Sequence, residues 1–165
     1  MVYNEYLVND IKEKLVEREE PLAIAESVTS GNLQAAMSLA IDASNFYQGG
    51  ITAYNLGQKA RHLNVEPIHA EKCNCISAKI AATMALEAAK MFTSDYAIGI
   101  TGYASIVPEN EEEGLFAFVA IVYKNKVIFD KRITSEKQDV CAVQLDYTNQ
   151  VLKLFHNVLY HADSL

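Results

Sequence analysis

The sequence predicts an α/β fold, a three-layer α/β/α sandwich around a mixed sheet, and three observations support this prediction. Short apolar runs of strand length alternate with longer segments whose apolar residues recur at helical spacing. Two of the strand-like runs are separated only by Lys124-Asn125, which favours an antiparallel hairpin. No repeat, linker or composition shift divides the chain, so we expect one domain over residues 1–165.

The first elements follow from periodicity and capping. Apolar residues recur at helical spacing over residues 4–18, which predicts an amphipathic helix. The apolar run 22–25 then has the length of a buried strand. An alanine- and leucine-rich segment over 32–39 predicts a second helix, with Thr29 and Ser30 in capping position.

The middle of the chain predicts one strand followed by helices. The strand-like run 46–54 contains the pair Gly49-Gly50, which suggests a bulge or a close backbone approach. Glu66-Pro67 breaks the helical pattern behind this strand. The expected helices cover 56–63, one turn at 69–73 and, behind a Ser77 cap, 78–92.

The C-terminal elements complete the sheet and one helical layer. The apolar run 96–100 predicts a buried central strand that ends at Thr101-Gly102. The remaining expected elements are strands over 115–123 and 126–134 and a long helix over 139–161.

Composition excludes several classes of function. The 165 residues carry 14 basic and 21 acidic side chains, and the net charge of −7 argues against a nucleic-acid partner. No apolar run is long enough for a membrane span, and the first 20 residues do not resemble a secretory signal. Three cysteines do not suggest a disulfide framework, so a reducing cytoplasm is the expected location. We interpret the acidic run 109–113 as a solvated loop tip.

The pair Cys73-Asn74-Cys75 does not predict a metal site. Its spacing differs from the C-x₂-C pairs of structural zinc sites, and the sequence has no second pair, although His62 and His69 are near in sequence. The spacing also differs from that of C-x-x-C redox motifs. We therefore expect neither a metal nor a cofactor.

The segment around Ser27 suggests catalysis by an activated serine. The predicted strand 22–25 leads into Ser27 and then into a helix, which places a serine hydroxyl at the end of a sheet near helical N–H groups. A serine is a weak nucleophile unless a neighbouring base takes its proton. Lys59, with Tyr54 before it, is a candidate base for the same pocket, although a serine in the position of Ser27, taken alone, is far more often a helix cap than a nucleophile.

Four short motifs, in order, resemble the C-terminal domain of the CinA competence/damage-inducible proteins. Residues 25–31 read A-E-S-V-T-S-G where that family has A-E-S-C-T-G-G, and the paired glycines precede Tyr54 and Lys59 as in the family's second motif. Ile76-Ser77 before a helix and the strand 97–102, which ends in T-G, resemble the third and fourth.

The resemblance implies an activity and a set of site residues. Stand-alone members include nicotinamide-nucleotide amidohydrolases, which convert nicotinamide mononucleotide to the acid and ammonia without a metal. Ser27 would then be the nucleophile, Lys59 the base, and Tyr54 the residue that orients the lysine or the amide. The resemblance also implies a homo-oligomer. The candidate substrate-binding residues are Thr29, Ser30, Gly31, Gly50, Thr101 and Gly102.

Some positions depart from the family pattern. The loop that reads T-G-x-A-G-P in the family has Ser105 and Ile106 in place of its glycine and proline. The family arginine before the last helix has no counterpart over 135–146, where Lys137 is the only cation. A binding or assembly domain without turnover therefore stays open as an alternative, as does a Ser-Lys hydrolase for another small amide.

Overall fold

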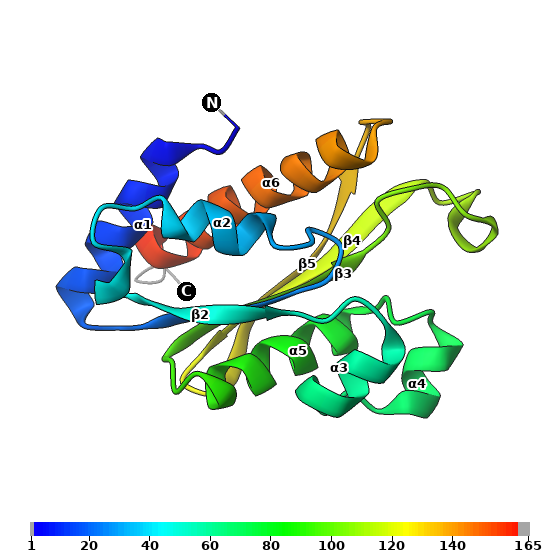
Figure 1. Cartoon of the computed structure of the whole chain (residues 1–165), viewed down its shortest axis with the longest axis horizontal. Helices are drawn as coiled ribbons and strands as arrows, with labels where there is room; N and C mark the ends of the chain where they lie inside the picture. The colour runs from blue at the N-terminus through cyan, green and yellow to red at the C-terminus, as the bar shows by residue number, and fades with distance from the viewer. Residues whose placement is uncertain (1, 162–165) are drawn as a thin grey trace.

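A five-stranded mixed sheet forms the centre of the protein (Figure 1). The computed structural model describes residues 2–161, so the ends of the expected 1–165 domain lie outside the described residues. The strands are β1 (Leu22–Glu26), β2 (Tyr47–Thr52), β3 (Tyr96–Gly102), β4 (Leu115–Tyr123) and β5 (Lys126–Ser135). Their order is β2-β1-β3-β4-β5. Strand β1 is parallel to β2 and β3, whereas β4 is antiparallel to β3 and β5.

Helices cover both faces of the sheet and confirm the predicted α/β class. On one face lie α1 (Glu5–Arg18), α2 (Asn32–Ser38) and α6 (Val140–His161). On the other lie α3 (Leu56–Leu63), α4 (Pro67–Lys72) and α5 (Ala78–Met91). Two short 3₁₀ turns cover Ala43–Asn45 and Pro108–Asn110.

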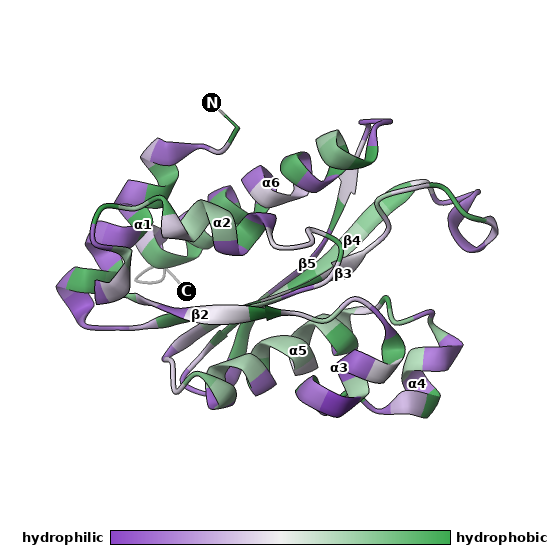
Figure 2. Cartoon of the chain, viewed as in Figure 1, coloured by the Kyte–Doolittle hydropathy of each residue, from purple (hydrophilic) through white to green (hydrophobic). Residues whose placement is uncertain are grey.

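The two faces of the sheet build two apolar cores. Figure 2 shows the hydrophobic colouring along β4 and the polar outer sides of the helices. The larger core joins the sheet to α1, α2 and α6, and the smaller one joins it to α5. Gly99 of β3 permits this second contact, because a Cβ there would clash with the backbone oxygen of Ala81 in α5.

The structure confirms both features predicted for the paired glycines of β2, a bulge and a close backbone approach. The register between β1 and β2 shifts by one residue, since Leu22 pairs with Tyr47 but Ala23 pairs with Gly49. A Cβ on Gly50 would lie 2.6 Å from the backbone oxygen of Ile24, so the two strands approach too closely there for a side chain. The strand ends at Thr52, two residues before the predicted boundary.

The predicted cap of α2 is wrong. Ser30 and Gly31 adopt positive φ values of 50° and 96°, and the N-cap residue Gly31 offers no side chain. Instead, the fully buried carboxylate of Glu26 accepts hydrogen bonds from the backbone N–H groups of Leu33 at 3.1 Å and Gln34 at 3.0 Å. A residue of the preceding strand therefore caps the helix, and it fixes the turn that carries Ser27.

Two further boundaries differ from the prediction. The Glu66-Pro67 pair begins a helix rather than only ending one, because the Glu66 carboxylate accepts bonds from the N–H groups of Ile68 and His69. Strand β3 runs through Thr101 and Gly102, which are its last two residues, instead of stopping at Ile100. By contrast, the Ser77 cap of α5 and the Lys124-Asn125 hairpin turn, with φ values of 47° and 63°, confirm the predictions.

Candidate functional site

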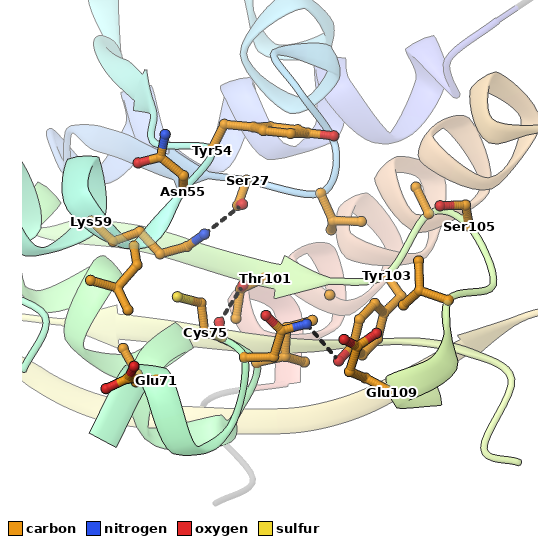
Figure 3. Close-up of a pocket in the computed structure, with 18 of the residues that line it drawn as sticks. Ser27, Tyr54, Asn55, Lys59, Glu71, Cys75, Thr101, Tyr103, Ser105 and Glu109 are labelled. Atoms are coloured by element: carbon orange, nitrogen blue, oxygen red, sulfur yellow. Dashed lines mark hydrogen bonds between the residues drawn. The ribbon is translucent and has the colours of Figure 1, made fainter. Parts of the chain in front are cut away.

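A pocket of about 660 Å³ opens beside the carboxyl ends of β1 and β3 (Figure 3). The turn after β1, the start of α3 and the α4–α5 connection line one part of it. The end of β3, the loop behind it and Val140 of α6 line the rest. Ligands in α/β proteins commonly bind outside the carboxyl ends of strands, so this is the expected place for a site.

Ser27 lies in this pocket immediately after β1 and is 5% exposed. Its backbone N–H donates to the Ile100 carbonyl at 3.1 Å, which ties the turn to the neighbouring strand β3. Its own carbonyl accepts from the Ser30 N–H at 3.0 Å. The hydroxyl is therefore carried by a backbone that is held on both sides.

Lys59 reaches the same hydroxyl from the next parallel strand-helix unit. It lies with Leu63 on the buried face of α3 and is 2% exposed. Its Nζ donates a hydrogen bond of 2.9 Å to the Ser27 Oγ (Figure 3). Burial lowers the pKa of Lys59, and the nearby Cys75 opposes this shift to a smaller extent.

This pair satisfies the geometric requirement for an activated serine. A base must lie within about 2.6–3.2 Å of the hydroxyl whose proton it takes. It must also be unprotonated at working pH, and desolvation favours the neutral amine. The structure therefore brings together the two residues that the sequence proposed as nucleophile and base.

The α4–α5 connection forms the floor beside the pair. Asn74 and Cys75 adopt positive φ values of 48° and 61°, and the Cys75 carbonyl accepts a 2.8 Å bond from the Thr101 hydroxyl. Burial raises the pKa of the Cys75 thiol, while Lys59 lowers it to a smaller extent. Thr101 and Gly102 both line the pocket, as the sequence predicted.

Tyr54 lines the pocket without contacting the Ser27–Lys59 pair. It lies beyond β2 and is 69% exposed, and its hydroxyl has no hydrogen bond to Ser27 or Lys59. Figure 3 shows its ring along the rim. The structure therefore gives Tyr54 a position from which it could touch a ligand, but not one that orients the lysine.

Four of the candidate binding residues lie off the pocket wall. Thr29, Ser30, Gly31 and Gly50 do not line it. The buried Thr29 hydroxyl donates instead to the Glu26 carboxylate, and Gly50 contacts β1. Their place is in the framework behind Ser27 rather than on the ligand side.

Sequence reasoning missed two carboxylates of the pocket. Glu71, at the end of α4, and Glu109, in the 3₁₀ turn, are exposed side chains that line it. The four glutamates of the run 109–113 are exposed, as predicted, yet the first of them borders the pocket. Asn110 shapes this loop, because its buried amide accepts from the Val107 N–H at 2.7 Å and donates to the Gly114 carbonyl at 3.0 Å.

Two kinds of feature are missing from residues 2–161. No group of three or more His, Cys, Asp or Glu side chains is arranged to hold a metal ion. Within the same range, no helix has the length and apolar composition that crossing a bilayer requires.

Comparison with known proteins identifies the family of this chain. The family model of the CinA C-terminal domain matches residues 4–159, which is nearly the whole chain. The chain belongs to the CinA C-terminal domain family. This confirms the resemblance that the four motifs indicated.

CinA relatives match the chain at different lengths. Protein MG115 of Mycoplasma genitalium is 34% identical over 155 residues, which are 92% of this chain and 96% of that protein. A CinA-like protein of Prochlorococcus marinus is 30% identical over 151 residues, 90% of this chain. This chain spans about a third of the length of several relatives, 35% of the Prochlorococcus protein and 32% of one from Natranaerobius thermophilus.

Solved CinA structures share the fold. The competence damage-inducible protein A of Klebsiella pneumoniae has a TM-score of 0.87 and 25% identity, with 96% of this chain and 98% of that one covered. A CinA superfamily protein of Escherichia coli has a TM-score of 0.82 and 28% identity, with 92% and 88% covered.

Proposed function

We propose that this CinA-family protein hydrolyses the carboxamide of nicotinamide mononucleotide to nicotinate mononucleotide and ammonia. The observation that carries the proposal is the 2.9 Å hydrogen bond between Lys59 Nζ and Ser27 Oγ, in a buried pair that borders an open pocket. A buried lysine has few structural reasons to face a serine, because desolvating an ammonium is costly. An amide, in turn, needs an activated nucleophile.

The reaction would proceed through an acyl-enzyme. Ser27 Oγ attacks the amide carbon while neutral Lys59 takes the hydroxyl proton, and a tetrahedral intermediate forms. The lysine then gives this proton to the leaving nitrogen, so the C–N bond breaks and ammonia departs. Water attacks the ester with Lys59 again as base, which releases the acid and regenerates the serine.

The turn after Ser27 offers a donor for the developing oxyanion. Val28 follows the nucleophile and lines the pocket, and its backbone N–H donates to no protein acceptor among the described residues. The N–H that follows a nucleophile on a strand-to-helix turn commonly serves in an oxyanion hole. We assign this role to Val28, and we place Tyr54, Thr101 and Gly102 around the ring that carries the amide.

Two wider expectations accompany the proposal. An intracellular pyridine nucleotide as substrate implies a cytoplasmic location. Two exposed large apolar side chains, Tyr54 and Val140, line the pocket, which favours a homo-oligomer that covers them.

One observation favours a second candidate, a ligand-binding domain without turnover. No arginine lines the pocket in the described part of the chain, and Lys137 lies outside it. Such a pocket lacks the bidentate group that most readily holds a phosphate.

The deciding experiment measures ammonia and nicotinate mononucleotide released from nicotinamide mononucleotide. We expect turnover by the native protein and none by Ser27→Ala or Lys59→Met. Ser44→Ala and Lys79→Met are matched controls, since both change exposed residues outside the pocket. Folded native protein without turnover would favour the binding domain, whereas turnover that survives in Ser27→Ala would refute the assigned nucleophile.

A further inference from the structure

The charges that line the pocket are unbalanced. Its lining holds two carboxylates, Glu71 and Glu109, and a single basic side chain, Lys59. Lys59 is engaged with Ser27, and its burial favours the neutral amine. Neither carboxylate forms an ion pair with another described residue. A ligand therefore meets an excess of negative charge.

The same two carboxylates also line a second hollow that adjoins the pocket. An adjoining hollow of about 380 Å³ shares Glu71, Asn74 and Tyr103 with the pocket, together with Glu109. Figure 3 shows Glu71 and Glu109 set apart from the Ser27–Lys59 pair, with Tyr103 beside Glu109. A substrate whose amide lies at Ser27 and whose other end extends into this hollow must pass near both carboxylates.

The hollow itself does not offset this charge. Its lining adds Glu113 and Lys72. Glu113 is paired with Arg132 at 2.9 Å, and the pair adds no net charge to the hollow. Lys72 is an exposed side chain and the one cation in the lining of this hollow. At neutral pH a phosphate monoester, whose second pKa is about 6, carries close to two negative charges and would be repelled.

We propose that the pocket favours a carboxamide on a cationic ring that bears no phosphate, so that a pyridinium nucleoside is a better substrate than its nucleotide. This inference rests on the proposed amidohydrolase activity and goes beyond it: nicotinamide mononucleotide is hydrolysed, but less efficiently than the corresponding nucleoside. The pyridinium charge suits the carboxylates of the pocket, and the absence of a phosphate removes the repulsion. Glu71 and Glu109 are then specificity-determining residues.

The test compares kcat/KM for nicotinamide riboside and nicotinamide mononucleotide, which differ by one phosphate. At low ionic strength we expect the nucleoside to be favoured by about tenfold, and the preference to shrink as added salt screens the carboxylates. Glu109→Gln and Glu71→Gln should each lower the preference by about threefold. Glu112→Gln, an equal charge change in the same loop but outside both hollows, should leave it unchanged.

The outcomes separate this inference from the proposed function. Ser27-dependent turnover with the nucleotide preferred, or a preference that Glu109→Gln and Glu71→Gln do not alter, overturns the inference and leaves the amidohydrolase intact. If the folded protein hydrolyses neither compound, the proposed amidohydrolase activity is refuted. Ser27-dependent turnover with the nucleoside preferred, and the preference reduced in both pocket variants, supports both.

Discussion

Replacement of Glu26 by glutamine tests whether a buried carboxylate holds the nucleophile turn together. The side chain is fully buried between β1 and α2. One carboxylate oxygen accepts from the Thr29 hydroxyl and the Leu33 N–H, and the other accepts from the Gln34 N–H. Glutamine has nearly the same shape, so the substitution changes charge and acceptor number while leaving the packing in place.

The expected loss follows from these three bonds. Hydrogen bonds to a charged group contribute about 1.5–3 kcal/mol each, against about 0.5–1.5 kcal/mol for neutral pairs. The amide keeps one acceptor oxygen, which weakens two bonds, and its NH₂ group faces the Gln34 N–H, which removes the third. The favourable interaction of a negative charge with the start of α2 is lost as well. We expect the free energy of unfolding to fall by about 3 kcal/mol.

Urea unfolding monitored by circular dichroism measures this change. Glu112→Gln, an exposed residue, is the matched control and should stay within about 0.5 kcal/mol of the native protein. Turnover should fall in Glu26→Gln under conditions where the variant is still folded, because Ser27 directly follows residue 26. A Glu26→Gln variant as stable as the control would refute the view that the carboxylate caps α2.

Three other predictions concern the lysine and the sheet. Lys59→Met should abolish turnover and, because it removes a buried amine, raise the free energy of unfolding in urea by about 1–2 kcal/mol. A variant less stable than the native protein would contradict this prediction. The rate should rise with pH as Lys59 loses its proton, with a midpoint below the ordinary lysine value of about 10.4, and a pH–rate profile with no such limb would count against Lys59 as base. Gly99→Ala should cost about 3 kcal/mol by forcing α5 off β3, whereas Gly57→Ala in an exposed part of α3 should be neutral or stabilising in the same unfolding assay.

Local patterns were sufficient for most of the fold. The hairpin turn at Lys124-Asn125 and the Ser77 cap depend on neighbouring residues alone, so the sequence predicted them correctly. The Gly49-Gly50 pair also carried its own signal, because glycine in a strand marks a bulge or a close approach.

Contacts between distant segments could not be predicted in the same way. Thr29 and Ser30 have the composition of caps, but whether Glu26 reaches back over the turn depends on the path of the backbone. Tyr147 is fully buried and donates to the Tyr103 carbonyl at 3.1 Å, a contact between α6 and the loop after β3 that no periodicity indicates.

The candidate site also has residues that the sequence predicted and residues that only the folded structure shows. Ser27 and Lys59 were predicted together from the order of motifs, and their 2.9 Å contact agrees with it. The carboxylates of Glu71 and Glu109 come from helix α4 and from the 3₁₀ turn after β3, which are far apart in sequence. Only the folded chain brings them to one pocket, so composition could not distinguish Glu109 from its solvated neighbours.

The position of β2 at the edge of the sheet has a consequence for how the protein would lose its function. Ser27 follows β1, which is paired on both sides, but Lys59 is carried by α3 behind a strand that is paired on one side only. Edge strands tend to open in local fluctuations before the core of a sheet does. Such an opening would separate the base from its serine while the remaining strands stayed folded, so inactivation would precede global denaturation and would be reversible once β2 pairs again.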